Sequence, residues 1–184
     1  MSTTLIVLGL VAVIFVWFAA IYNKLVKGKT LVKEGWSGVD VQLKRRYDLI
    51  PNLVETVKGY SQHEKGLFEE VTNLRSRSMN AGTLKEKGEA EAALSNTLKS
   101  LFAVAEAYPE LKANRNFMEL QKALYDTEEQ IQLARRYYNG TVRNYNIIVE
   151  AFPSNIVASM FKFGKEEFFG VESEAVREAP KVGF

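Results

Sequence analysis

Residues 5–21 read LIVLGLVAVIFVWFAAI, an apolar stretch that decides how the rest of the chain is interpreted. Residues 1–23 contain no Asp, Glu, Lys, Arg or His. At about 1.5 Å per residue, a helix of this length reaches about 34 Å, enough to cross a hydrocarbon layer of about 30 Å. Trp17 and Tyr22 lie near one end, as expected for aromatic rings at a membrane–water interface. The stretch therefore predicts a transmembrane anchor over residues 1–23.

Two other interpretations of this stretch are weaker. A cleaved secretory signal needs a basic segment before the apolar run, whereas this chain begins Met1-Ser2-Thr3-Thr4. The best cleavage site would be Phe18-Ala19-Ala20. A buried core helix is the remaining alternative.

Positive charge is concentrated beside the anchor. The whole chain carries 24 Lys and Arg against 22 Asp and Glu, a net charge of +2, which argues against a nucleic acid partner. Lys24, Lys27 and Lys29 follow the anchor directly, and basic residues close to a span resist translocation. We therefore expect the N-terminus outside, the remaining residues in the cytoplasm, and these lysines against anionic lipid headgroups.

Beyond the anchor, apolar residues recur at spacings of three and four, which indicates helices with one buried face. Three such stripes begin at Leu25, Leu84 and Phe117. We predict an all-α fold, in which the N-terminal transmembrane helix is followed by an antiparallel helical bundle over residues 24–153. Thr83 and Glu86 at the start of the second stripe predict a capping box. Pro109 predicts the start of the third long helix.

Pro51 decides whether the bundle has three long helices or four. Proline lacks a backbone donor and disfavours the helical conformation of the preceding residue, which predicts a kink or a reversal. The stripe passes through Pro51 in phase, which favours a kink. The similar lengths of segments 24–50, 51–79 and 84–108 favour separate helices instead. Both alternatives remain open.

Three charged residues, Arg45, Arg46 and Asp48, stand just before Pro51. We expect Asp48 to accept from freed amides of the following turn and an arginine to donate to stranded carbonyls.

A kinked first helix has a consequence for assembly. Residues 24–50 would then present an apolar stripe of Leu25, Val32, Trp36 and Leu43 that a shorter second helix cannot cover. Exposed stripes of that size are normally buried in an interface, which predicts a homo-oligomer.

Polar residues also interrupt the third apolar stripe, and buried side-chain amides usually fix the register of neighbouring helices. The alternative is that some of them pair with another copy. They are Asn116, Gln121, Thr127, Arg135, Asn139 and Asn146.

Residues 154–170 are rich in aromatic side chains, among them Phe161 and Phe163. They are interpreted as a short helix whose rings cap the bundle end or, alternatively, as an amphipathic segment that touches lipid or a partner. Residues 171–184 are predicted to be a solvated, disordered tail.

Few residues suit catalysis or metal binding. The absence of cysteine excludes disulfides and thiolate metal sites, and the single histidine, His63, excludes multi-histidine centres. Asp126, Glu128 and Glu129 lack the histidines of a di-metal bundle site. We therefore expect neither an enzyme nor a cofactor.

Several motifs resemble the LemA family of bacterial membrane proteins. The most specific is RRYDLIPNLV at residues 45–54, and similarity extends over residues 22–169 through the pairs Trp36-Ser37, Arg135-Arg136 and Phe152-Pro153. The resemblance implies a single N-terminal span in the bacterial cytoplasmic membrane and a cytoplasmic helical bundle. It supplies no catalytic or ligand residues. Relatives include magnetosome membrane proteins, and family members often sit beside membrane zinc metallopeptidases.

Two hypotheses of function follow. In the first, the protein is a non-enzymatic scaffold that self-assembles at the membrane and organises or shapes it. In the second, it is an adaptor for a membrane protease or another membrane protein complex.

Overall fold

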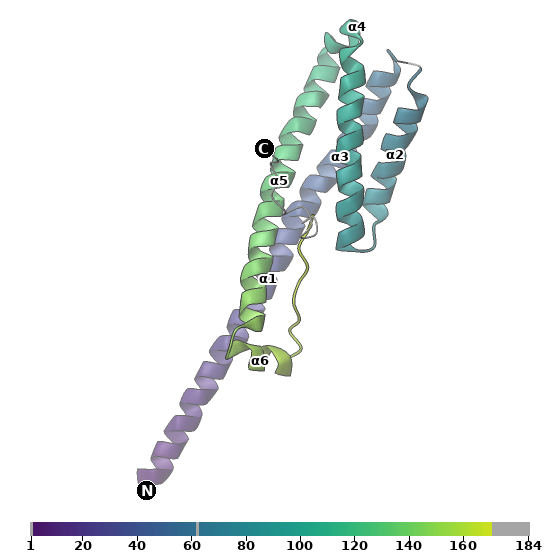
Figure 1. Cartoon of the computed structure of the whole chain (residues 1–184). Helices are drawn as coiled ribbons and strands as arrows, with labels where there is room; N and C mark the ends of the chain where they lie inside the picture. The colour runs from purple at the N-terminus through teal and green to yellow at the C-terminus, as the bar shows by residue number, and fades with distance from the viewer. Residues whose placement is uncertain (1, 62, 171–184) are drawn as a thin grey trace, which may run out of the picture. The chain divides into compact units, whose positions relative to one another are not determined.

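A computed structural model of the chain describes residues 2–61 and 63–170. This part is helical and contains no strand, so the all-α prediction is confirmed. The predicted tail at 171–184 lies outside the described residues. The helices, labelled in Figure 1, are α1 (Ser2–Lys58), α2 (Lys65–Asn80), α3 (Leu84–Glu106), α4 (Pro109–Lys112), α5 (Arg115–Glu150) and α6 (Ser154–Met160).

The described chain divides into two compact units. Among the described residues, the first unit combines residues 2–40 with 133–167, and the second combines residues 41–61 and 63–132 with 168–170. Helices α1 and α5 contribute to both units. In the first unit the two helices run antiparallel, because Gly28 lies against Tyr145 and Gly35 against Tyr138.

Helix α1 continues through Pro51 and ends at Lys58, so the chain does not reverse at the proline. Proline cannot donate to the carbonyl four residues earlier, which here is that of Tyr47. Arg75 of α2 supplies the missing donor, since its Nε lies 2.7 Å from the Tyr47 oxygen. As expected, an arginine donates to a carbonyl near Pro51 that lacks its usual backbone donor. This arginine is Arg75 of α2, however, and not Arg45 or Arg46.

This replacement of a lost hydrogen bond is testable with a double-mutant cycle. Arg75→Leu should lower the free energy of unfolding by about 1–3 kcal/mol, because it leaves the Tyr47 carbonyl without this donor. Pro51→Ala restores a backbone N–H, so the same arginine substitution should cost much less in that background. Urea denaturation followed by circular dichroism measures both effects. Equal costs in the two backgrounds would contradict this account.

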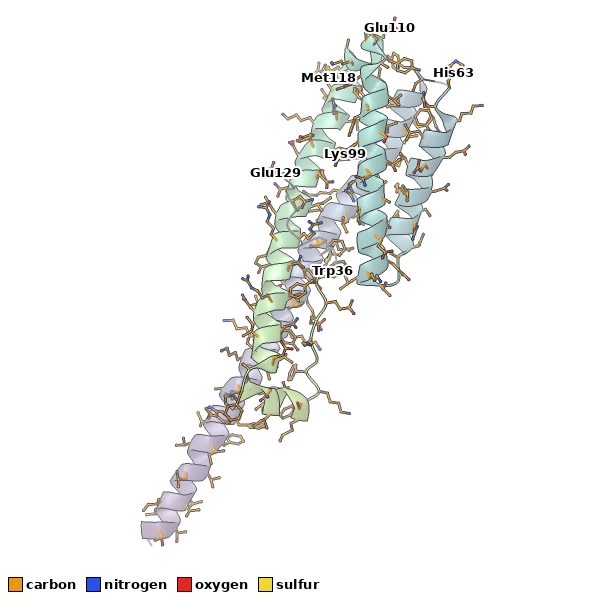
Figure 2. All side chains as sticks on the ribbon, in the orientation of Figure 1. Trp36, His63, Lys99, Glu110, Met118 and Glu129 are labelled. Atoms are coloured by element: carbon orange, nitrogen blue, oxygen red, sulfur yellow. The ribbon has the colours of Figure 1, made fainter. Side chains whose placement is uncertain are left out.

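The first reversal of the chain lies between α1 and α2, so the alternative of a separate helix over 51–79 is wrong. After Val57 the helix tightens, as the amides of Tyr60 and Ser61 both donate to the Val57 carbonyl at 3.0 Å. Gly59 lies in this turn, where the low helix propensity of glycine favours termination. His63 lies exposed in the same connection (Figure 2).

The turn between α2 and α3 confirms the predicted capping box. The Thr83 hydroxyl accepts from the Glu86 amide at 3.2 Å, while the Glu86 carboxylate accepts from the Thr83 amide at 3.3 Å. This short turn places α2 and α3 side by side (Figure 1). Pro109, by contrast, begins only the four-residue helix α4. The long helix α5 begins at Arg115, after Asn114 accepts from the Phe117 amide at 3.1 Å.

The apolar stripe at 24–50 is covered, and the expectation that it projects from the bundle is wrong. Leu25 and Val32 are buried in the first unit, and Leu43 is buried in the second. The Trp36 ring packs edge-on against Tyr138 of α5, with ring centroids 5.5 Å apart. Within the first unit, α5 packs against α1 and covers surface that a shorter helix would have left open.

Candidate functional site

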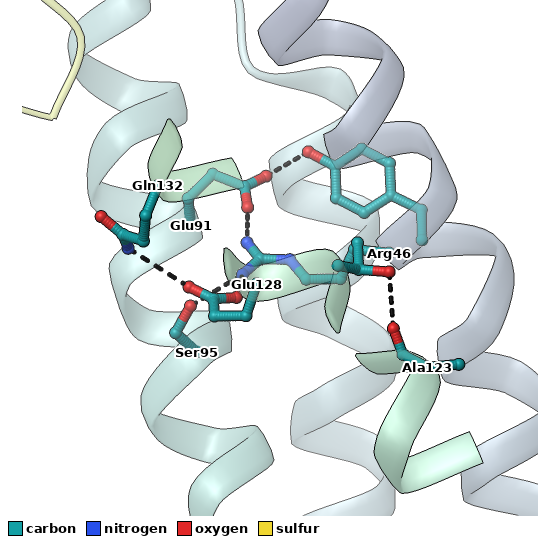
Figure 3. Close-up of polar contacts among 8 residues, drawn as sticks. Arg46, Glu91, Ser95, Ala123, Glu128 and Gln132 are labelled. Atoms are coloured by element: carbon teal, nitrogen blue, oxygen red, sulfur yellow. Dashed lines mark hydrogen bonds and ion pairs between the residues drawn. The ribbon is translucent and has the colours of Figure 1, made fainter. Parts of the chain in front are cut away.

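A cluster of charged side chains lies buried among three helices of the second unit. Arg46 of α1 is 2% exposed, and its Nη2 pairs with the Glu91 carboxylate of α3. Its Nη1 lies 2.8 Å from the Ser95 hydroxyl and 2.6 Å from Oε2 of Glu128 on α5. Figure 3 shows the guanidinium between the two carboxylates. We name Arg46, Glu91, Ser95 and Glu128 the charge cluster.

The charge cluster has further partners around it. Tyr47 donates its hydroxyl proton to the Glu91 carboxylate. Gln132 Nε2 lies 3.5 Å from the other oxygen of Glu128, which is partly exposed to solvent. One arginine thus ties α1 to α3 and α5 at a single level. The net stability gained from a buried ion pair is small, because the cost of removing both charges from water offsets much of their attraction.

The geometry of the charge cluster does not support a role in catalysis or metal binding. Both terminal nitrogens of the guanidinium contact side chains of α3 or α5, and arginine does not lose its proton in proteins. Among the described residues, no group of three or more His, Asp or Glu side chains is arranged to hold a metal ion.

A second feature, the aromatic collar, lies in the first unit and consists of Phe18, Tyr22, Phe161 and Phe163. The Phe161 ring centroid lies 5.8 Å from that of Phe18 and 4.8 Å from that of Tyr22. The ring centroid of Phe163 lies 5.8 Å from that of Tyr22. The ammonium of Lys29 lies 6.0 Å from the Phe163 ring centre, at the outer limit of a cation–π contact. The residues after α6 are therefore attached to α1 where its uncharged segment ends.

The segment after the collar, residues 164–167, is held by hydrogen bonds between its backbone and side chains of α5. Asn146 donates its Nδ2 proton to the Glu166 carbonyl and accepts from the Glu166 amide, both at 2.9 Å. Tyr138 donates its hydroxyl proton to the Glu167 carbonyl at 2.8 Å. Burial raises the pKa of Tyr138 to about 12, and the carboxylates of Glu166 and Glu167 act in the same direction. The hydroxyl therefore stays protonated and keeps this bond at neutral pH.

The structure distributes the remaining predicted residues over both units. Trp17, Lys24 and Lys27 are exposed on α1, as are Arg45 and Asp48 beside the buried Arg46. Asn116 and Gln121 are exposed near the start of α5, whereas Arg135 and Asn139 are half-buried further along the same helix.

The partners of Arg46 were missed from the sequence, although a signal was present. Glu91 lies seven residues before Leu98, in phase with the apolar stripe of α3. Arg46 likewise lies between Leu43 and Ile50 in the stripe of α1. Opposite charges within two apolar stripes indicate a buried pair, because an isolated buried charge is costly.

Helix α1 is long and apolar enough to cross a membrane by its length and composition, and the side chains from Leu5 to Val16 are exposed. Such an apolar helix joined to a helical bundle defines an all-α, membrane-associated protein. The sequence model of the LemA family matches residues 35–184, so the chain belongs to the LemA family.

Curated relatives agree with this assignment. Magnetosome protein MamQ 2 of Paramagnetospirillum magneticum is 25% identical over 174 residues, covering 80% of this chain and 64% of that protein. Magnetosome protein MamQ of Magnetospirillum gryphiswaldense is 24% identical, with 72% of this chain and 58% of that protein covered. Protein LemA of Metamycoplasma hominis is 24% identical, with 73% of this chain and 58% of that protein covered. The chain thus spans less than two thirds of the length of these relatives.

Proposed function

We propose that this protein is a membrane-anchored scaffold of the bacterial cytoplasmic membrane, which self-associates and thereby organises or shapes the bilayer without catalysing a reaction. Lys24 and Lys27, exposed just after the uncharged segment, support an N-terminus outside and the following residues in the cytoplasm. The same lysines suit anionic headgroups. The magnetosome names of two relatives support a membrane-related role.

The observation that carries self-association is an apolar stripe on the outer side of α5 in the first unit. Leu133, Tyr137 and Ile147 are all exposed there and follow helical spacing around Gly140. No described atom lies within 4 Å of a Cβ built at Gly140, so another helix has room to approach the backbone. A symmetric pair of such stripes would bury apolar surface on both copies.

Self-association is tested with the full-length protein in mild detergent. Size-exclusion chromatography with light scattering should give a protein mass well above the 20.8 kDa of one chain. Leu133→Glu should reduce that mass by placing a charge in the interface. Met79→Glu on α2 is the matched control, because Met79 is 50% exposed and Leu133 is 48% exposed. A strictly monomeric wild type at micromolar concentration would contradict self-association.

An adaptor role is the alternative, since the same stripe could receive a different membrane protein. Crosslinking in cells followed by mass spectrometry separates the two functions. A scaffold should recover mainly crosslinks between its own copies, whereas an adaptor should recover one stoichiometric foreign protein.

A further inference from the structure

Helix α6 has two different faces. Val157 and Ala158 are buried, whereas Ile156 and Met160 are exposed on the other side. Phe152, just before the helix, is exposed as well. We name Phe152, Ile156 and Met160 the α6 foot. Three large apolar side chains gathered on a seven-residue helix and its approach are unusual for a surface in contact with water.

The aromatic collar determines where the α6 foot lies along α1. Phe161 follows Met160 directly, and its ring contacts Phe18 and Tyr22. These two residues are in the last six of the uncharged segment 1–23. If that segment spans the bilayer, α6 lies at the level of the membrane–water interface. Figure 1 shows α6 beside α1, just after the end of α5.

The charge around the α6 foot also suits a lipid surface. Residues 151–165 contain no acidic side chain, and Lys162 is exposed immediately after the foot. Lys24 and Lys27 are exposed on α1 near the collar. Apolar side chains flanked by lysines are typical of segments that enter the interface of an anionic membrane.

We infer that the α6 foot inserts into the lipid leaflet in which the anchor ends, as a second membrane contact held beside α1 by the aromatic collar. The occupant of this apolar face is the bilayer, because the aromatic collar attaches the residue after the foot to the end of the span and exposed lysines, Lys24, Lys27 and Lys162, lie near the collar. The inference goes beyond self-association and does not depend on it. Because inserted side chains take up space among the lipids, each copy would increase the area of that leaflet.

Site-specific fluorescence tests the insertion. The chain has no cysteine, so Met160→Cys carries one environment-sensitive nitrobenzoxadiazole label. The full-length protein is reconstituted into vesicles of phosphatidylcholine and phosphatidylglycerol. We expect blue-shifted emission and quenching by acyl chains brominated near the headgroup, at a depth of about 5–10 Å. Ile156→Cys provides a second, independent position on the same face.

Two control positions make the outcomes distinguishable. Met118→Cys on α5 replaces an exposed methionine of the second unit and should show water-like emission without lipid quenching. Leu10→Cys reports whether the anchor itself is inserted. Labels at 156 and 160 that stay unquenched while the label at 10 is quenched would overturn the inference and leave the anchor intact. Blue-shifted emission at 160 without lipid quenching would indicate a protein neighbour and would also overturn it. An unquenched label at 10 would overturn anchor and foot together.

Discussion

Replacing Arg46 with alanine is expected to lower the free energy of unfolding by about 3–5 kcal/mol, because it removes one partner of a buried ion pair. The substitution leaves Glu91 charged, buried and without its guanidinium partner. It also removes the donor that Ser95 and Glu128 share. Urea denaturation in mild detergent, followed by circular dichroism, measures the loss.

Neighbouring and compensating variants show whether this loss comes from the buried charge. Arg45→Ala removes the adjacent exposed arginine and should change stability by no more than about 0.5 kcal/mol. The double variant Arg46→Met/Glu91→Leu removes both buried charges and should recover most of the lost stability. If Arg46→Ala unfolds at the wild-type urea concentration, the charge cluster does not hold the helices together.

The substitution Gly35→Leu is expected to cost about 3 kcal/mol through overpacking of α1 against α5. A Cβ at Gly35 would lie 3.1 Å from the Tyr138 Cα and 3.2 Å from the Thr141 hydroxyl oxygen. A backbone atom cannot rotate away as a flexible side chain can, so the two helices must separate. Separation exposes Trp36, which packs on Tyr138, and its emission should shift to the red. The measurement uses a Trp17→Phe background, because the chain has two tryptophans.

Gly38 provides the matched control for Gly35 on the same helix. No described atom lies within 4 Å of a Cβ built there. Gly38→Leu should therefore leave Trp36 emission unchanged, and Gly38→Ala should stabilise α1 by about 0.5–1 kcal/mol. Similar destabilisation by leucine at 35 and at 38 would contradict close packing at Gly35.

Local signals in the sequence were sufficient for several elements. The uncharged run at 1–23 predicts an apolar helix because its composition alone sets its preference for lipid. The Thr83–Glu86 capping box depends only on residues three apart, and the structure confirms it. The end of α5 before Phe152-Pro153 was likewise visible from the position of the proline.

The sequence did not predict features that depend on contacts between residues far apart in the chain. At Pro51 the sequence left a kink and a reversal open. The structure excludes the reversal, because the helix continues through Pro51, and Arg75 donates to the freed Tyr47 carbonyl from 28 residues away. Leu25 and Val32 were expected to be exposed, yet both are buried in the first unit. The length of α5 decides this, and the break at Asn114 that sets its start was not predicted.

By itself, the sequence determined that the chain is helical, carries an apolar segment able to span a bilayer, and belongs to the LemA family, since periodicity, hydrophobicity and motifs are local properties. Only the tertiary structure decided which charges are buried together, which carbonyl accepts a hydrogen bond from Arg75, and which apolar faces stay exposed on α5 and α6. The physical reason is that burial and pairing depend on residues far apart in the chain, and those distances are set by packing.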